Sequence, residues 1–111
     1  DNVISDAIGM RDKEFVYHAL ATLIDTDTEM VRRIFGMRAP KPIVALCWKA
    51  GLSMRTALKL EKDLAQVQPK SLIYPRGGTD YPLDDDDMIW QLEFLGVINA
   101  KGRYLFVADD L

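Results

Sequence analysis

Apolar residues recur at helical spacing along most of this chain, and this periodicity constrains the fold more than any other feature of the sequence. A spacing of about 100° per residue is typical of amphipathic helices. It predicts helices over residues 11–25, 27–38, 42–50, 53–67 and 84–95. In the first segment, the apolar residues that share one helical face are Phe15, Val16, Ala19, Leu20, Leu23 and Ile24.

The boundaries of these segments carry helix start and stop signals. Thr26-Asp27-Thr28-Glu29 has the pattern of a capping box, in which Thr26 and Glu29 satisfy each other's free backbone N–H groups. Pro42 suits the first position of the third helix, because the N–H that proline lacks would be unpaired there. Gly51 suits the end of that helix, and Ser53 suits the N-cap of the next one.

The third segment is apolar on nearly every side, with Lys49 as its one charged residue. A helix of this kind belongs in the middle of a packed structure, so we expect Cys47 and Trp48 to lie in the core. Cys47 is also the only cysteine among 111 residues, so no internal disulfide bond can form. This cysteine usage suits a reducing cytoplasm.

A weak internal repeat relates two helix–turn–helix units at a shift of 26 residues. Ala19-Leu20-Ala21 matches Ala45-Leu46-Cys47, and the same shift brings Asp25 onto Gly51. Common two-helix repeats are longer, at about 34 to 47 residues. The five short helices, together with this internal repeat, predict an all-α, HEAT-like array of short antiparallel helix pairs. We expect a single domain over residues 1–111.

The end of the chain differs from the rest. In residues 97–111, two β-prone runs flank the turn Asn99-Ala100-Lys101-Gly102, which predicts a short hairpin or tail. Because a lone hairpin is marginal in water, it would have to pack on a helix or pair with another chain. Nearby aromatic residues either seal the end of the helical stack or form an exposed interaction patch. They are Trp90, Phe94, Tyr104 and Phe106.

One stretch of the sequence resembles a known family. Lys49-Ala50-Gly51-Leu52-Ser53-Met54-Arg55-Thr56-Ala57, with Phe15 to Leu23 upstream, resembles a domain-of-unknown-function family (number two-three-three-six) that is typical of alphaproteobacteria. The resemblance covers about residues 10–70. It implies a HEAT-like stack of helix pairs in a cytoplasmic bacterial protein. The family brings no known activity, so the resemblance implies no catalytic residues.

Residues that support catalysis or metal binding are sparse. The only histidine, His18, falls on a polar helix face, and Cys47 falls in the most apolar helix, so no nucleophile–base pair or zinc spacing is visible. The four acids of residues 84–87 would fan out around a helix start, where they complement the helix dipole, instead of converging on a metal. The sequence of residues 74–78 lacks the Gly-Lys-Ser/Thr ending of a phosphate-binding loop, so we predict a plain turn there. We therefore expect no enzyme activity and no cofactor or metal.

Charge is sorted along the chain. Residues 1–30 hold seven Asp/Glu and two Lys/Arg, residues 31–76 hold two and ten, and residues 77–111 hold eight and two. The net charges are −5, +8 and −6, within a total of −3.

The longest apolar run, residues 43–48, is far shorter than the roughly 20 residues of a membrane span. The chain begins at Asp1 instead of Met, so we expect a fragment of a longer protein.

The basic middle is the best functional candidate in the sequence. Its residues form one stripe on the fourth helix and the outer face of the second, and they would make one basic face if these helices stack in register. They are Arg32, Arg33, Arg55, Lys59 and Lys62. This face would be solvated, pair with residues 84–87, or bind another molecule.

We expect a non-enzymatic, cytoplasmic protein-interaction or scaffold module that uses this face to bind an acidic protein or a second copy of the chain. The alternative is a nucleic-acid-associated regulatory domain, which the acidic segments on both sides disfavour.

Overall fold

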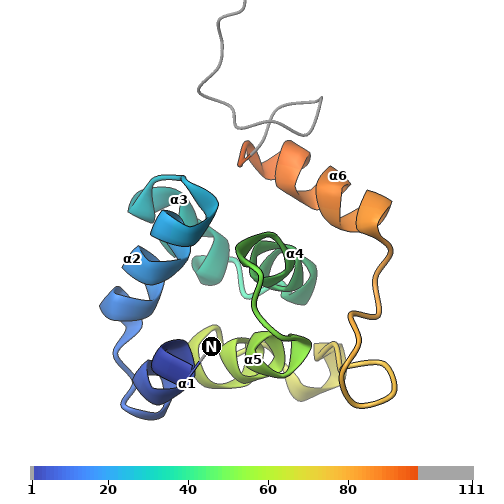
Figure 1. Cartoon of the computed structure of the whole chain (residues 1–111), viewed down its shortest axis with the longest axis horizontal. Helices are drawn as coiled ribbons and strands as arrows, with labels where there is room; N and C mark the ends of the chain where they lie inside the picture. Colours follow the sequence, from blue (N-terminus) through green and yellow to red (C-terminus); the bar gives the residue numbers. More distant parts are fainter. Residues whose placement is uncertain (1, 98–111) are drawn as a thin grey trace, which may run out of the picture.

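The computed structural model describes residues 2–97, and within this range the chain is built from helices joined by turns and one longer loop (Figure 1). The all-α class is therefore confirmed for the described residues. The predicted β-prone extension lies outside them, apart from Val97, which is buried. The elements are α1 (Asn2–Gly9), α2 (Lys13–Ile24), α3 (Thr28–Gly36), α4 (Pro40–Ala50), α5 (Met54–Lys59), a π-helical turn η1 (Leu60–Leu64), a 3₁₀ turn η2 (Pro69–Ser71) and α6 (Asp85–Leu95).

Helix α4 forms the centre of the fold. It packs against α2, α3, α5, η1 and α6, and it lies in the middle of the view in Figure 1. Residues 43–47 of this helix have no exposed surface, which confirms the prediction of a central helix and of a buried Cys47. Trp48 is only partly buried against this core, so its prediction as a core residue is right in part.

The turns that follow α2 and α4 have the same construction. Each helix ends at a residue with a left-handed backbone, Asp25 (φ 56°) after α2 and Gly51 (φ 79°) after α4. In the first turn the Thr26 N–H bonds to the Ala21 carbonyl at 2.9 Å, and in the second the Leu52 N–H bonds to the Cys47 carbonyl at 3.0 Å. These bonds are those of a Schellman end. They are related by the 26-residue shift seen in the sequence, while the wider HEAT-like repeat stays a prediction.

Two predicted helix starts are wrong in detail. Helix α3 is capped by Asp27, whose carboxylate accepts a hydrogen bond from the Glu29 N–H at 3.0 Å. The capping box therefore does not form, because Thr26 belongs to the turn that ends α2. Helix α4 begins at Pro40 instead of Pro42. Both prolines fit, because the first N–H groups of a helix have no partner within the helix.

Two further elements differ from the predicted pattern. Helix α1 was not predicted, although its buried residues Ile4, Ala7 and Ile8 follow helical spacing. The helix predicted over residues 53–67 divides into α5 and η1 and ends at Leu64. In η1 the Ala65 N–H bonds to the Leu60 carbonyl at 2.9 Å, which is the wider i→i+5 register of a π-helix.

The buried face of α2 is rotated relative to the predicted one. Its buried residues are Val16, Tyr17, Leu20, Ala21 and Ile24. Tyr17 turns inward because its ring packs on the ring of Phe35 in α3, with the centroids 5.2 Å apart. Phe15 and Leu23, which were predicted on the same face as Leu20, remain exposed along the edge of the helix.

Candidate interaction groove

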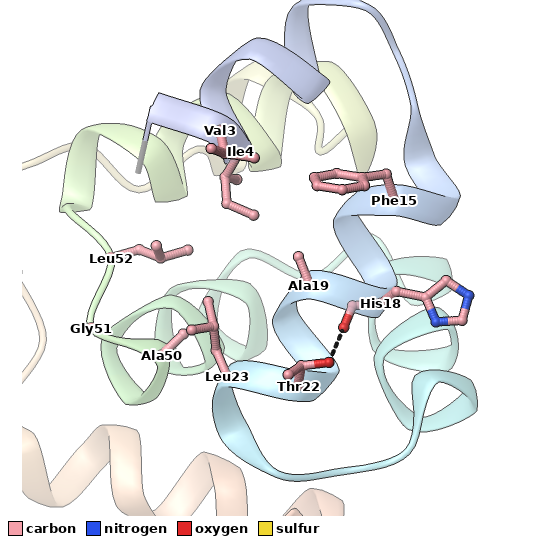
Figure 2. A pocket seen from close by; sticks show the side chains of 10 residues that line it. All are labelled: Val3, Ile4, Phe15, His18, Ala19, Thr22, Leu23, Ala50, Gly51 and Leu52. Carbon is pink, nitrogen blue, oxygen red and sulfur yellow. Dashed lines mark hydrogen bonds between the residues drawn. The ribbon is translucent and has the colours of Figure 1, made fainter.

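An apolar groove lies between α1, α2 and the turn from α4 to α5, and Figure 2 views it from close by. Its volume is about 650 Å³, within the range of about 300 to 1,000 Å³ that is usual for ligand pockets. Helix α1 supplies Val3 and Ile4, and the turn supplies Ala50, Gly51 and Leu52. Helix α2 supplies Phe15, His18, Ala19, Thr22 and Leu23.

Large apolar side chains in this groove keep much of their surface in contact with water. The exposed fractions are 64% for Val3, 42% for Phe15 and 50% for Leu23, whereas Ile4 and Leu52 are buried. In Figure 2 the side chains of Ile4, Phe15 and Leu52 point toward a common space. Apolar surface that is exposed within one hollow is typical of a binding site, because it is not needed to form the core.

The local sequence explains how the three walls meet. Asp12 caps α2 by accepting a hydrogen bond from the Phe15 N–H at 3.2 Å, which fixes the start of the helix beside α1. Gly51 adopts a φ of 79°, a conformation that side chains disfavour, and thereby turns the chain sharply between α4 and α5. Leu52 follows directly and forms part of the groove wall.

A smaller hollow of about 200 Å³ adjoins the groove, because both include Val3 and Phe15. It adds Met10, which is exposed, and the carboxylates of Asp6 and Asp12. The residues that line the two hollows include no lysine or arginine. The combined surface is therefore apolar along its length and acidic at the α1 end.

The groove offers apolar contact and little acid–base chemistry. His18 is the only titratable residue in the lining of the larger hollow, and its ring points away from the groove in Figure 2. Its Nδ1 atom lies 3.0 Å from the Thr28 hydroxyl oxygen. The Thr22 hydroxyl donates a hydrogen bond to the His18 carbonyl at 2.9 Å. Neither polar side chain is directed at a ligand in the apolar hollow.

The predicted basic residues of α3 contact their own neighbours. Arg32 donates a hydrogen bond to Glu14 of α2 at 2.5 Å and another to Glu29 of its own helix. The bond to Glu14 lowers the pKa of the Glu14 carboxyl. The Arg33 guanidinium lies 3.3 Å from the sulfur of Met30. Arg32 therefore joins α2 to α3.

The other predicted basic residues lie along α5 and η1. The Arg55 Nε donates to the Gly78 carbonyl at 3.1 Å, the Lys62 ammonium lies 6.0 Å from the centre of the Tyr74 ring, and Lys59 is exposed. In Figure 1, α3 and α5 lie on different sides of α4. The structure thus groups Arg55, Lys59 and Lys62 but does not bring them together with the arginines of α3.

The structure also shows the surroundings of the acidic residues 84–87 and of the aromatic residues that follow them in α6. Asp87 lies 3.9 Å from the ammonium of Lys41 in α4. Trp90 and Phe94 are 54% and 73% exposed, and their rings stack with centroids 5.2 Å apart. Tyr104 and Phe106, the other members of the predicted patch, lie outside the described residues. The turn predicted over residues 74–78 lies slightly later, over residues 76–80, and is closed by two backbone hydrogen bonds between Arg76 and Asp80 of 2.7 and 2.9 Å.

Comparisons with protein-family models, curated protein sequences and solved structures find no match to this chain. The resemblance to the alphaproteobacterial family stays a prediction. Within residues 2–97, no cluster of three or more His, Cys, Asp or Glu side chains is arranged to hold a metal ion. None of the helices in this range has the length and apolarity needed to span a membrane.

Proposed function

We propose that this protein is a non-enzymatic interaction module whose groove binds an amphipathic helix of a partner protein. The observation that carries this proposal is the exposure of Val3, Phe15 and Leu23 around one hollow that Leu52 also lines. An amphipathic helix binds such a surface by inserting apolar side chains spaced at i, i+3, i+4 and i+7. A few anchor residues buried near the centre of an interface usually supply most of its binding energy.

The charge around the groove favours a partner helix with basic flanks. Asp6 and Asp12 lie in the adjoining hollow, and residues 1–30 carry a net charge of −5. Opposite charges on the rim of an interface increase the association rate and help to select the partner. The basic residues of α5 and η1 lie on a separate surface, so an acidic partner at that surface stays a second prediction of the same functional class.

The test uses a designed peptide of about 18 residues, five helical turns, with leucines on one helical face and lysines on the other. Its binding is followed by NMR on the methyl groups of Val3, Leu23 and Leu52. We expect these methyl signals to shift. Leu23→Asp should weaken binding by at least about tenfold. Leu23 is half exposed, so this variant should still fold.

Phe94→Asp is the matched control, because Phe94 is an exposed apolar residue of α6 outside the groove. It should bind the peptide as the unmodified chain does. Equal loss of binding in both variants, or equal binding of a peptide with the same composition in scrambled order, would contradict the groove as the docking site. A Leu/Glu peptide that binds as well as the Leu/Lys peptide would contradict the basic flanks.

A further inference from the structure

The carboxyl group of Glu61 is buried inside the fold. Glu61 lies in the π-helical turn η1 and has no exposed surface. Its Oε1 atom accepts a hydrogen bond from the Ile73 N–H at 2.8 Å, whereas its Oε2 atom is buried and has no hydrogen-bond partner in the described part of the chain. A carboxylate usually needs several donors when it is removed from water, so this position suits the neutral, protonated form.

The hydrogen bond that Glu61 accepts from the Ile73 N–H holds the long segment that connects η1 to α6. Two other side-chain bonds tie this segment to the fold. Arg55 donates to the Gly78 carbonyl at 3.1 Å from an exposed position, and the partly buried Tyr81 hydroxyl donates to the Leu52 carbonyl at 2.6 Å. Because Leu52 is a wall of the groove, the segment that Glu61 holds is connected directly to the proposed docking site.

The groups around Glu61 do little to stabilise its ionised form. Burial is the largest effect and raises the pKa of Glu61 to about 7, although the hydrogen bond from the Ile73 N–H and the charge of Lys62, the next residue of η1, both favour the charged carboxylate. From α4, the Cys47 thiol is close enough that the Glu61 charge helps burial to raise the pKa of this thiol. Burial and the neighbouring Cys47 also raise the pKa of the Tyr81 phenol.

Helices α1, α4 and α5 also pack on η1. The buried residues of α1 are Ile4, Ala7 and Ile8, and the charged residues of α5, Arg55 and Lys59, are exposed.

We propose that Glu61 is a proton-controlled latch for residues 68–83. When protonated, the side chain stays buried and holds the Ile73 N–H. When ionised, it gains more from water than from its one hydrogen bond, and it leaves its site and releases the segment. Release also removes the support that Tyr81 gives to the Leu52 wall. The effect on binding rests on the proposed function of the groove, whereas the latch itself does not.

The latch is tested on the chain alone by amide hydrogen exchange at Ile73 and Tyr81, corrected for the intrinsic dependence of exchange on pH. If opening requires ionisation of Glu61, the opening constant should rise by about tenfold per pH unit between the pKa of a free glutamate and that of the buried one. Between about pH 5 and about pH 8 the total rise should reach about 100-fold. A protection factor for Ile73 that does not change with pH would overturn the latch.

Two variants separate Glu61 from other titrating groups. Glu61→Gln keeps the shape and an acceptor oxygen for Ile73 but cannot ionise, so its opening constant should not vary with pH. Asp63→Asn removes an exposed acid of the same turn and should keep the full pH dependence. If Glu61→Gln does not fold, the ¹³C carboxyl signal of Glu61 in the unmodified chain decides. Its midpoint should lie near pH 7, and a midpoint near the pKa of a free glutamate would overturn the proposal.

The connection to the groove is tested with the Leu/Lys peptide at about pH 5 and about pH 8. Affinity should fall at the higher pH in the unmodified chain, and it should change much less in Glu61→Gln. Equal pH dependence in both chains would overturn the connection between latch and groove. Absence of peptide binding at both pH values would contradict the proposed function, while the exchange measurements would still decide the latch.

Discussion

Helices α4 and α2 are both short and rich in apolar residues, yet the fold covers them very differently. Residues 43–47 of α4 have no exposed surface, because four helices and the turn η1 pack against this helix. In α2, Val16, Leu20 and Ile24 are equally well buried, but Phe15 and Leu23 remain about half exposed. Helix α2 therefore carries more apolar surface than the core covers. This excess needs another explanation, and the groove beside α1 supplies one.

The strongest test of this contrast compares the same substitution in the two helices. Leu46→Ala in α4 removes a fully buried side chain and leaves a cavity, so the free energy of unfolding should fall by about 3 kcal/mol. Leu23→Ala in α2 removes a side chain that is 50% exposed, and should cost less than about 1 kcal/mol. Urea denaturation measures both values. A cost for Leu23→Ala close to that for Leu46→Ala would mean that this edge of α2 belongs to the core.

A second prediction concerns Glu61, an ionisable side chain buried in the turn that packs on α4. Because the pKa of Glu61 is raised to about 7 in the folded chain, the folded state binds a proton that the unfolded state releases at a lower pH. Stability is therefore greatest below the pKa of a free glutamate and falls as the pH rises to about 7. The free energy of unfolding should decrease by about 2.5 kcal/mol between about pH 5 and about pH 8.

Glu14 acts in the opposite sense and in another pH range. The hydrogen bond from Arg32 lowers the pKa of Glu14, so the stability that Glu14 contributes is lost only as the pH falls below the usual range of a glutamate.

The variant Glu61→Gln tests the effect of Glu61. Its denaturation curves should be nearly independent of pH between about pH 5 and about pH 8. An unchanged pH dependence in this variant would assign the effect to other groups.

The contrast between α4 and α2 also explains what the sequence could and could not reveal. Helical spacing located both helices within a few residues, and the all-apolar character of α4 indicated its central position. Spacing alone does not determine which apolar residues a neighbouring helix will cover. Phe15 and Leu23 share a face with Leu20 in the pattern, but their exposure depends on where α1 and the α4–α5 turn pack. The eight residues of α1 gave too short a pattern to be recognised.

The same distinction applies to the charged residues. The i, i+4 and i+7 spacing predicts one stripe of Arg55, Lys59 and Lys62 on a single helix, whereas the structure places Arg55 and Lys59 in α5 and Lys62 in η1. Whether Arg32 lies near this stretch depends on how the helices are arranged around α4. Glu61 adjoins Lys62 in the sequence, and nothing in the local spacing marks it as buried. Its burial results from the π-helical turn and from the segment that folds back over it.

The smallest predicted effects come from the two turns that end α2 and α4. Gly51 has a left-handed backbone (φ 79°), and no atom lies within 4 Å of the position that a Cβ would take. Gly51→Ala should therefore lose about 1 kcal/mol of stability through backbone strain alone, without crowding. Asp25 adopts a similar conformation (φ 56°) with a side chain and an unfavourable negative charge at a helix C-terminus. Asp25→Gly should thus gain about 0.5 kcal/mol. Thermal denaturation should show shifts of opposite sign, and a loss of stability in Asp25→Gly would mean that the aspartate side chain stabilises this turn.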